Sequence, residues 1–173
     1  MPPAWHEKGN VLSAMKRYDE AMNCYRKAAE LDFKPFDFWH DQAKECYDLG
    51  KYEKALILYE VVTEFRPTDV NAWNNKGNVY YALGRYNDSI NCYDEVLLQD
   101  KQHKYAWHNK GLALNNLGNY NESLKYFDNA LVIDPQYVDA WNDKGIAFYS
   151  MGKYVEAIDC YDNVIALDPE YTY

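Results

Sequence analysis

Apolar and small side chains recur along the chain in two stripes, and the same pair of stripes appears five times. The first stripe joins a tryptophan to a small residue four positions later, and the second joins a tyrosine to residues three, seven and ten positions further on. Such steps keep side chains on one face of an α-helix. The tryptophans stand 34 residues apart, at Trp5, Trp39, Trp73, Trp107 and Trp141. A fixed period of this length predicts an all-α array of repeated helix pairs.

Small residues mark the places where the two helices of a pair should approach each other. The first stripe has Gly9, Ala43, Gly77, Gly111 and Gly145. The second stripe has an aromatic residue, a small residue and another aromatic residue, as in Tyr18, Ala21 and Tyr25. Glycine inside a helix costs about 1 kcal/mol relative to alanine. We expect close approach of the second helix, at Ala21, Ser89 or Ala157, to offset that cost.

Glycine and proline mark the expected ends of helices in the repeats. Gly50, Gly84, Gly118 and Gly152 each stand two residues before the tyrosine that opens the second stripe. Glycine at this place relieves the left-handed conformation that commonly ends a helix. The first repeat has Lys16 instead, so its turn should be strained. Pro67, Pro135 and Pro169 are expected to stop the second helix.

These boundaries divide residues 1–173 into one array of five repeats, at about 2–35, 36–69, 70–103, 104–137 and 138–171. The combination Trp-x-x-x-Gly, then Gly-x-Tyr-x-x-Ala, then Tyr, Ala or Val and Pro, resembles the tetratricopeptide repeat family over essentially the whole chain. The resemblance implies a right-handed superhelical solenoid of antiparallel helix pairs, ten helices in all. The chain is either complete or a fragment of a longer array.

The resemblance also implies a function, because such arrays usually receive a peptide of a partner protein on a concave surface lined by the first helices. Carried over by position, the candidate groove residues are His6, Asn10, His40, Lys44, Tyr47, Asn71, Asn74, Asn75, Asn78, Tyr81, Tyr105, His108, Asn109, Asn115, Asn142, Asp143 and Tyr149. The first helices have further groove positions at Asp37, Asp41, Leu112, Asp139 and Ile146.

Asparagines on the first helices support peptide binding independently of the resemblance. Asparagine costs up to about 0.7 kcal/mol per helix position relative to alanine, and its amide both donates and accepts hydrogen bonds. We therefore expect an extended peptide along Asn74, Asn75 and Asn109; the alternative is a face that is merely solvated. Acids at the two ends of the groove favour a peptide with basic residues and binding that weakens with salt. They are Glu7, Asp37, Asp41, Asp139 and Asp143.

A row of lysines follows three residues after tryptophan in four repeats, at Lys8, Lys76, Lys110 and Lys144, with Gln42 in the remaining one. If they reached the groove, these lysines would supply positive charge to bind the C-terminal carboxylate of a peptide. The better interpretation is a helix-packing seam, where the long aliphatic stems pack and the ammonium groups reach water.

The amino-acid composition disfavours some classes of binding partner. The 173 residues carry a net charge of −9, which disfavours nucleic acid and anionic membranes. No stretch approaches the ~20 apolar residues that span a bilayer. Cys24, Cys92 and Cys160 occupy one position in alternate repeats, too far apart for disulfides, so free thiols and a cytoplasmic location are expected.

Catalytic and metal chemistry find little support in the sequence. His6 and His40 hold equivalent places in neighbouring repeats, but a layer spacing of ~10 Å makes convergence on one zinc ion difficult. No phosphate-binding loop, zinc-protease motif or nucleophile elbow is present. We therefore expect no cofactor and no enzymatic activity.

A second function class stays open, a structural module that assembles through its ends. A solenoid needs its terminal faces covered, and no polar capping helix follows the fifth repeat, so Ile158, Ile165 and Leu167 should be partly exposed. End-to-end self-association of two copies would cover them.

Overall fold

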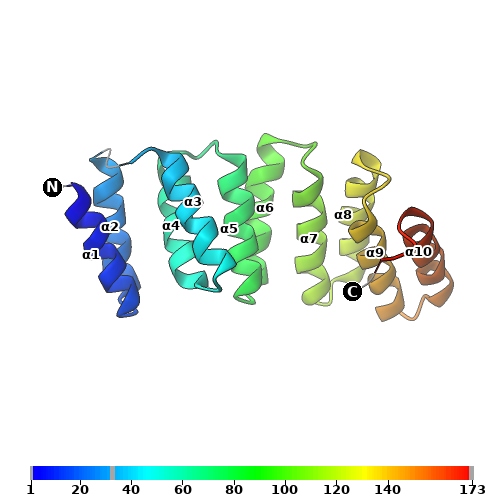
Figure 1. Cartoon of the computed structure of the whole chain (residues 1–173). Coiled ribbons are helices and arrows are strands. Elements are labelled where there is room, and N and C mark those ends of the chain that lie inside the picture. Colours follow the sequence, from blue (N-terminus) through cyan, green and yellow to red (C-terminus); the bar gives the residue numbers. More distant parts are fainter. Residues whose placement is uncertain (1, 32–33, 172–173) are drawn as a thin grey trace. The chain divides into compact units, whose positions relative to one another are not determined.

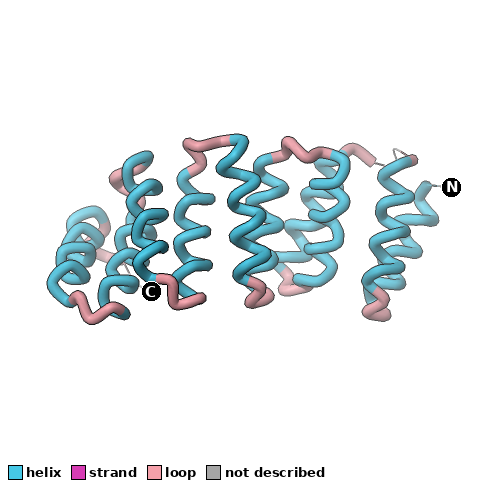
Figure 2. The backbone as a smooth tube through the Cα atoms, turned by 180° about the vertical axis from the view of Figure 1, so that it is seen from behind, coloured by secondary structure: helices cyan, strands magenta, loops and turns pink. Residues whose placement is uncertain are grey.

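The structure, a computed structural model, describes residues 2–31 and 34–171, and these residues form ten α-helices joined by short loops (Figures 1 and 2). The bounds are α1 Pro2–Ala14, α2 Tyr18–Glu30, α3 Phe36–Asp48, α4 Tyr52–Phe65, α5 Val70–Ala82, α6 Tyr86–Gln99, α7 Lys104–Asn116, α8 Tyr120–Ile133, α9 Val138–Ser150 and α10 Tyr154–Leu167. Neighbouring helices pack as antiparallel pairs, which confirms the predicted all-α helix-pair array.

The helices belong to two compact units, Met1–Arg85 and Tyr86–Tyr173, here called unit one and unit two. Unit one contains α1 to α5, with α1 packed on α2, α3 on α4, and α4 also against α2 and α5. Unit two contains α6 to α10, with α7 packed on α8 and α9 on α10, while α6 and α8 each pack against the next helix.

The interior of each pair is made from the predicted stripes. Tyr25, Tyr59, Tyr93 and Phe127 are among the largest fully buried side chains, beside fully buried small residues such as Ala21 and Ser123. The helices are amphipathic and short, so burial of these aromatic side chains against a neighbouring helix contributes most of their stability.

Close approach at the helical glycines is confirmed, but the predicted partner is wrong. A Cβ atom added at Gly9 would lie 2.6 Å from the ring of Tyr25, and one at Gly111 would lie 2.6 Å from the ring of Phe127. At Gly145 the ring is that of Tyr161, at 2.7 Å. Gly9 and Gly145 therefore make room for an aromatic ring of the second helix, rather than for Ala21 or Ala157, because the flat ring reaches further than a methyl group.

The turn between the two helices has one geometry throughout. Gly50, Gly84, Gly118 and Gly152 have φ between 70° and 78°, and Lys16 has φ 60°. In the first repeat, the amide of Arg17 bonds to the carbonyl of Leu12 at 2.9 Å, which closes a Schellman motif. The strain predicted for Lys16 is confirmed, since a side chain disfavours this conformation.

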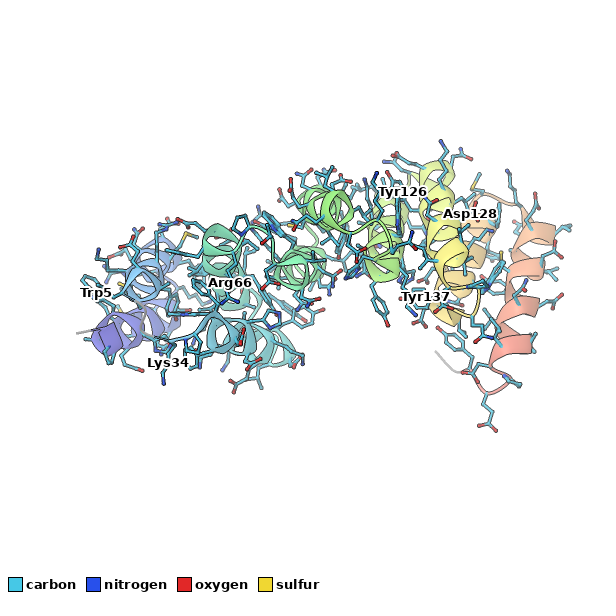
Figure 3. All side chains as sticks on the ribbon, turned by 90° about the horizontal axis from the view of Figure 1, so that it is seen from above. Trp5, Lys34, Arg66, Tyr126, Asp128 and Tyr137 are labelled. Carbon is cyan, nitrogen blue, oxygen red and sulfur yellow. The ribbon has the colours of Figure 1, made fainter. Side chains whose placement is uncertain are left out.

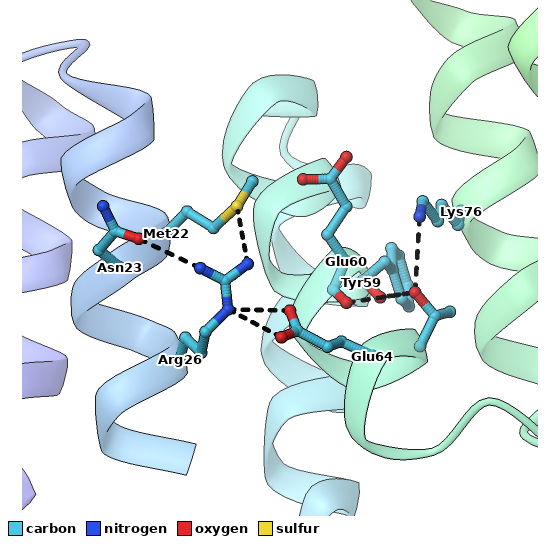
Figure 4. Close-up of polar contacts among 8 residues, drawn as sticks. Met22, Asn23, Arg26, Tyr59, Glu60, Glu64 and Lys76 are labelled. Carbon is cyan, nitrogen blue, oxygen red and sulfur yellow. Dashed lines mark hydrogen bonds and ion pairs between the residues drawn. The ribbon is translucent and has the colours of Figure 1, made fainter. Parts of the chain in front are cut away.

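Ion pairs on the outer helices tie neighbouring repeats together. In unit one, Nε of Arg26 on α2 donates to both carboxylate oxygens of Glu64 on α4 at 2.9 Å (Figure 4). The four cysteines are all free and buried, as predicted for three of them. Among the described residues, no helix is long and apolar enough to cross a membrane.

Candidate functional site

The candidate site is the set of predicted groove residues on the first helices, here called the first-helix face of each unit. In unit one it belongs to α1, α3 and α5, and in unit two to α7 and α9. Each helix contributes its side chains at the two positions after tryptophan and at positions one or two turns later. The local cause is the helical repeat, because residues three and four apart share a face.

In unit one, the first-helix face is mostly half-buried. His6 is buried, and Lys44 and Asn71 are exposed. The half-buried residues are Asn10, His40, Tyr47, Asn74, Asn75, Asn78 and Tyr81. Lys44 Nζ donates to Asp48 at 2.9 Å, and this hydrogen bond raises the pKa of Lys44. The exposed cation is therefore already paired with an acid of its own helix.

Hydrogen bonds join the first helices of unit one to one another. His6 Nε2 donates to Gln42 Oε1 at 3.1 Å, which links α1 to α3. Asn75 Nδ2 donates to His40 Nε2 at 3.2 Å, which links α3 to α5. Both histidines also lie against aromatic rings, His6 5.4 Å from Trp39 and His40 5.6 Å from Tyr59, between ring centroids. The two histidines thus have separate amide partners rather than a shared ligand.

Asn10 connects the face to the core of unit one. Its Oδ1 accepts from the hydroxyl of Tyr25 at 2.9 Å and from Lys54 Nζ at 2.9 Å. Burial raises the pKa of Tyr25 and that of Tyr59 far above the ordinary tyrosine value, because a phenolate would be poorly solvated there. Glu7 is exposed, and its hydrogen bond from Asn10 lowers its pKa.

The side-chain amide of Asn74 on α5 is incompletely hydrogen-bonded within the described part of the chain. Its Nδ2 is 3.5 Å from Asn75 Oδ1, while its own Oδ1 is buried and accepts no hydrogen bond from the described residues. Buried acceptors in folded proteins nearly always have a donor, so an unsatisfied one calls for an explanation.

In unit two, the first-helix face holds a buried polar network. His108 Nε2 is 2.6 Å from Asp143 Oδ2, and both side chains are buried. Asn142, also buried, donates to Asp143 Oδ1 at 3.2 Å, and the hydroxyl of Tyr137 is 3.0 Å from His108 Nδ1. A carboxylate only accepts, so His108 Nε2 carries a proton and donates it to Asp143 in a hydrogen bond.

The remaining groove candidates of unit two are more accessible. Tyr105 and Tyr149 are exposed, and Asn109 and Asn115 are half-buried. Asn115 Oδ1 accepts from Ser123 Oγ at 2.7 Å. The sequence grouped Asp143 with the exposed acids, and this is wrong, because Asp143 is buried against His108 and cannot attract a partner as a solvated charge.

The lysine row lies at a helix-packing seam, as predicted, but Lys110 is buried rather than reaching water. Lys110 on α7 pairs with Asp94 on α6, and Lys144 Nζ on α9 is 2.7 Å from Asp128 on α8 (Asp128 is labelled in Figure 3). In unit one, Lys76 Nζ is 3.5 Å from Thr63 Oγ1 (Figure 4). The ammonium groups lie over aromatic rings, with Lys144 Nζ 5.1 Å from the Trp141 ring centroid and Lys110 Nζ 4.5 Å from that of Tyr126.

Sequence reasoning missed three participants: Gln42, Lys54 and Tyr137. Gln42 was detectable, because it stands where four repeats have lysine. Tyr137 caps the start of α9, a position that differs in every repeat, and Lys54 lies on a second helix, so neither carried a periodic signal.

Comparisons with known proteins agree with this architecture. Models described as tetratricopeptide repeat match residues 2–34, 138–171 and 74–138, and one described as TPR repeat matches residues 43–84. No curated protein matches the chain in sequence.

Several solved structures share the fold. A crystal structure of MamA has a TM-score of 0.76 at 16% identity, over 94% of this chain and 95% of that one. MamA 41-end from Desulfovibrio magneticus RS-1 has a TM-score of 0.76 at 16% identity, over 99% and 97%. YrrB, described as a TPR protein with an unusual peptide-binding site, has a TM-score of 0.73 at 20% identity, over 96% and 86%.

The family models extend over residues 2–171, nearly the whole chain, and over the ten helices of the described residues. The chain belongs to the tetratricopeptide repeat family, whose members are typically non-catalytic scaffolds for protein interaction.

Proposed function

We propose that the protein is a non-catalytic scaffold that binds an extended peptide of a partner protein on its first-helix face, in the cytoplasm. Asn74 carries this proposal. Its buried Oδ1 has no donor among the described residues, while the residue itself is only half-buried. A rotation of the amide brings the oxygen to a backbone N–H offered at the surface, which offsets the cost of an unmade hydrogen bond.

Other side chains of the two first-helix faces suit a peptide ligand as well. Asn71 is exposed and Asn75 is half-buried, so the α5 part of the face presents amide donors and acceptors together. In unit two, the exposed rings of Tyr105 and Tyr149 offer apolar area with a polar tip, as binding surfaces often do. YrrB, which shares the fold, is itself described as having a peptide-binding site.

The charge of the face favours a peptide with basic residues. Asp37 and Asp41 in unit one and Asp139 in unit two are exposed, and Glu7 is exposed as well. Because exposed charges are screened by ions, binding should weaken as salt rises. A complex insensitive to salt, or one formed equally well with an acidic peptide, would contradict this part of the proposal.

The test is capture of a partner from a lysate of the source organism by wild type and by a triple variant, Asn74→Ala, Asn75→Ala and Asn109→Ala. The variant should lose the partner and keep its helical circular dichroism. A control triple variant, Asn91→Ala, Asn121→Ala and Asn129→Ala, removes three exposed amides from second helices and should capture normally. Equal capture by the two triple variants would refute the proposed peptide site.

The exposed apolar face of α10 favours a second candidate function, assembly of two copies. Val155, Ile158 and Ile165 are 71%, 57% and 60% exposed. Inside unit two, the equivalent face of α8 is covered by α9, where Trp141 packs on the cluster of Ala130, Leu131 and Ala140 and Lys144 pairs with Asp128.

The corresponding residues of α1 are all exposed: Ala4, Trp5 and Lys8. A second copy that placed them on α10 would repeat this contact, with Lys8 beside Asp162. Sedimentation velocity over a dilution series tests the contact. Asp162→Lys should abolish association, and adding Lys8→Glu should restore it. A protein that is monomeric at every concentration has no such function.

A further inference from the structure

A pocket of about 340 Å³ lies in unit one, away from the lysine seam, and Asn10 of the first-helix face is among its lining residues. It is bordered by the end of α1, by the turn to α2 and by the first residues of α4. Its lining includes Lys16, Lys51 and Lys54 together with the hydroxyl-bearing side chains of Ser13 and Tyr18.

The pocket is basic in an acidic protein. Three lysines line it and Glu53 is the only acid among the lining residues, whereas the whole chain has a net charge of −9. None of the three lysines forms an ion pair of 4.0 Å or less with a described residue, and Lys54 instead donates to the neutral amide of Asn10 at 2.9 Å. Elsewhere, lysines such as Lys27 and Lys44 have a carboxylate partner. The positive charge in the pocket is therefore largely uncompensated.

Lys16 occupies the pocket at a cost. It is the one described residue other than glycine with positive φ, and glycine fills this place in the other four turns. A side chain in the left-handed region costs on the order of 1 kcal/mol. Strained residues of this kind concentrate at functional sites, and here the strain places an ammonium group at the pocket.

The backbone adds to the same field. Tyr18 begins α2 and Tyr52 begins α4, and their N-cap residues Arg17 and Lys51 make no side-chain cap hydrogen bond. Neither cap residue offers a side-chain acceptor to the first amide groups of its helix, and the acids of these first turns are Asp19, Glu20 and Glu53. The amide groups supplement the lysines, because the start of a helix carries partial positive charge.

We infer that this pocket binds an oxyanion, a phosphate or carboxylate group, held chiefly by Lys16, Lys51 and Lys54. Charge-assisted hydrogen bonds from ammonium groups to such oxygens are stronger than neutral ones. The inference rests on the three lysines and the peptide proposal on Asn74, which does not line the pocket, so the failure of one is distinguishable from the failure of the other.

The experiment is an NMR titration of amide signals with inorganic phosphate at constant ionic strength. A second arm uses an uncharged tripeptide with a free C-terminal carboxylate, compared with the same peptide amidated. Saturable shifts at residues 16–18 and 51–54 with either probe support the site, and the arm that saturates identifies the oxyanion. If neither probe gives saturable shifts there, the inference is overturned.

Two variants test the lysines. The double variant Lys51→Gln and Lys54→Gln should weaken binding about tenfold or more, since two charge-assisted hydrogen bonds are lost. The control, Lys101→Gln with Lys125→Gln, makes the same charge change at exposed positions of unit two and should bind as wild type. Equal weakening in both double variants would mean non-specific ion binding and overturn the inference.

Lys16→Gly separates loss of the site from loss of the fold. Glycine relieves the positive φ, so the variant should melt at a higher temperature than wild type, while the loss of one ammonium group weakens oxyanion binding severalfold. A variant that is more stable and binds the probe as tightly as wild type would show that Lys16 takes no part.

Discussion

The first-helix faces of the two units use the same repeat positions with opposite chemistry. In unit one, His40 Nε2 accepts a hydrogen bond from the amide of Asn75, whereas in unit two His108 Nε2 donates one to the carboxylate of Asp143. Both partners stand 35 residues after their histidine. One atom of the partner, a nitrogen or an oxygen, therefore decides which ring nitrogen carries the proton.

The two faces also differ in how open they are. His40 and Asn75 are half-buried, while His108 and Asp143 are 5% and 6% exposed. A buried carboxylate needs partners for its oxygens, and Asp143 has His108 and Asn142. Unit two thus commits these side chains to its own packing, and unit one leaves amide groups nearer the surface for a ligand.

Alkaline pH is expected to have the largest effect on the stability of the folded protein. Burial raises the pKa of Tyr25 and Tyr59 in unit one and of Tyr137 in unit two above the ordinary value of 10.0. Unfolded tyrosines ionise near pH 10 and these do not, so the stabilisation is complete below pH 10 and is lost as pH rises above it. The loss approaches about 1.4 kcal/mol per pH unit for each phenol.

Hydrogen exchange followed by mass spectrometry from pH 9 upwards, corrected for the intrinsic rate, checks this. Both units contain phenols of this kind, so the helices packed around Tyr25, Tyr59 and Tyr137 should lose protection as pH rises above 10. A stability that stays flat to pH 12 would contradict the expected titration.

Loss of the buried acid should be the largest single-residue effect. Asp143→Ala leaves the Nε2–H of His108 buried without an acceptor, and the expected destabilisation is about 3 kcal/mol in urea unfolding. The control Glu95→Ala removes an exposed acid of the same unit and should change stability by less than about 0.5 kcal/mol. Similar losses in both would remove the distinction between the two faces.

The matching substitution in unit one should cost less. Asn75→Ala removes a neutral donor from the half-buried His40, where water can replace it, so we expect about 1 kcal/mol in the same unfolding assay. A loss as large as that of Asp143→Ala would mean that the two histidine contacts are equivalent after all.

The smallest expected effect on stability comes from moving a histidine proton from one ring nitrogen to the other. It is also the most direct test of the difference between the two first-helix faces. Imidazole ¹⁵N signals at neutral pH should show the proton on Nδ1 of His40 and on Nε2 of His108. Asp143→Asn, which can offer an N–H to His108 Nε2, should move the His108 proton to Nδ1. If the same ring nitrogen carries the proton in both wild-type histidines, the expected difference between the two faces is refuted.

Much of the fold could be predicted from the sequence. The 34-residue spacing of tryptophan, the small residue four positions on and the turn glycine specify helix pairs locally, through spacing and backbone conformation. Even the strain at Lys16 followed from its place in the repeat, because φ is a property of one residue and its turn.

The sequence misjudged contacts between helices. It assigned the space above Gly9 and Gly145 to small residues, and aromatic rings fill it. It also treated Asp143 as a solvated acid, although His108 lies 35 residues away in sequence and 2.6 Å away in space.

The sequence by itself determined the repeat, the helix pairs and the turns, because each of these rests on residues a few positions apart. Only the tertiary structure decided which polar side chains are buried in hydrogen bonds within the protein and which stay accessible to a ligand. Whether Asn74 keeps a free acceptor or three lysines share a pocket depends on helices from different repeats, and hydrogen bonding and charge compensation act over the few ångströms that separate them.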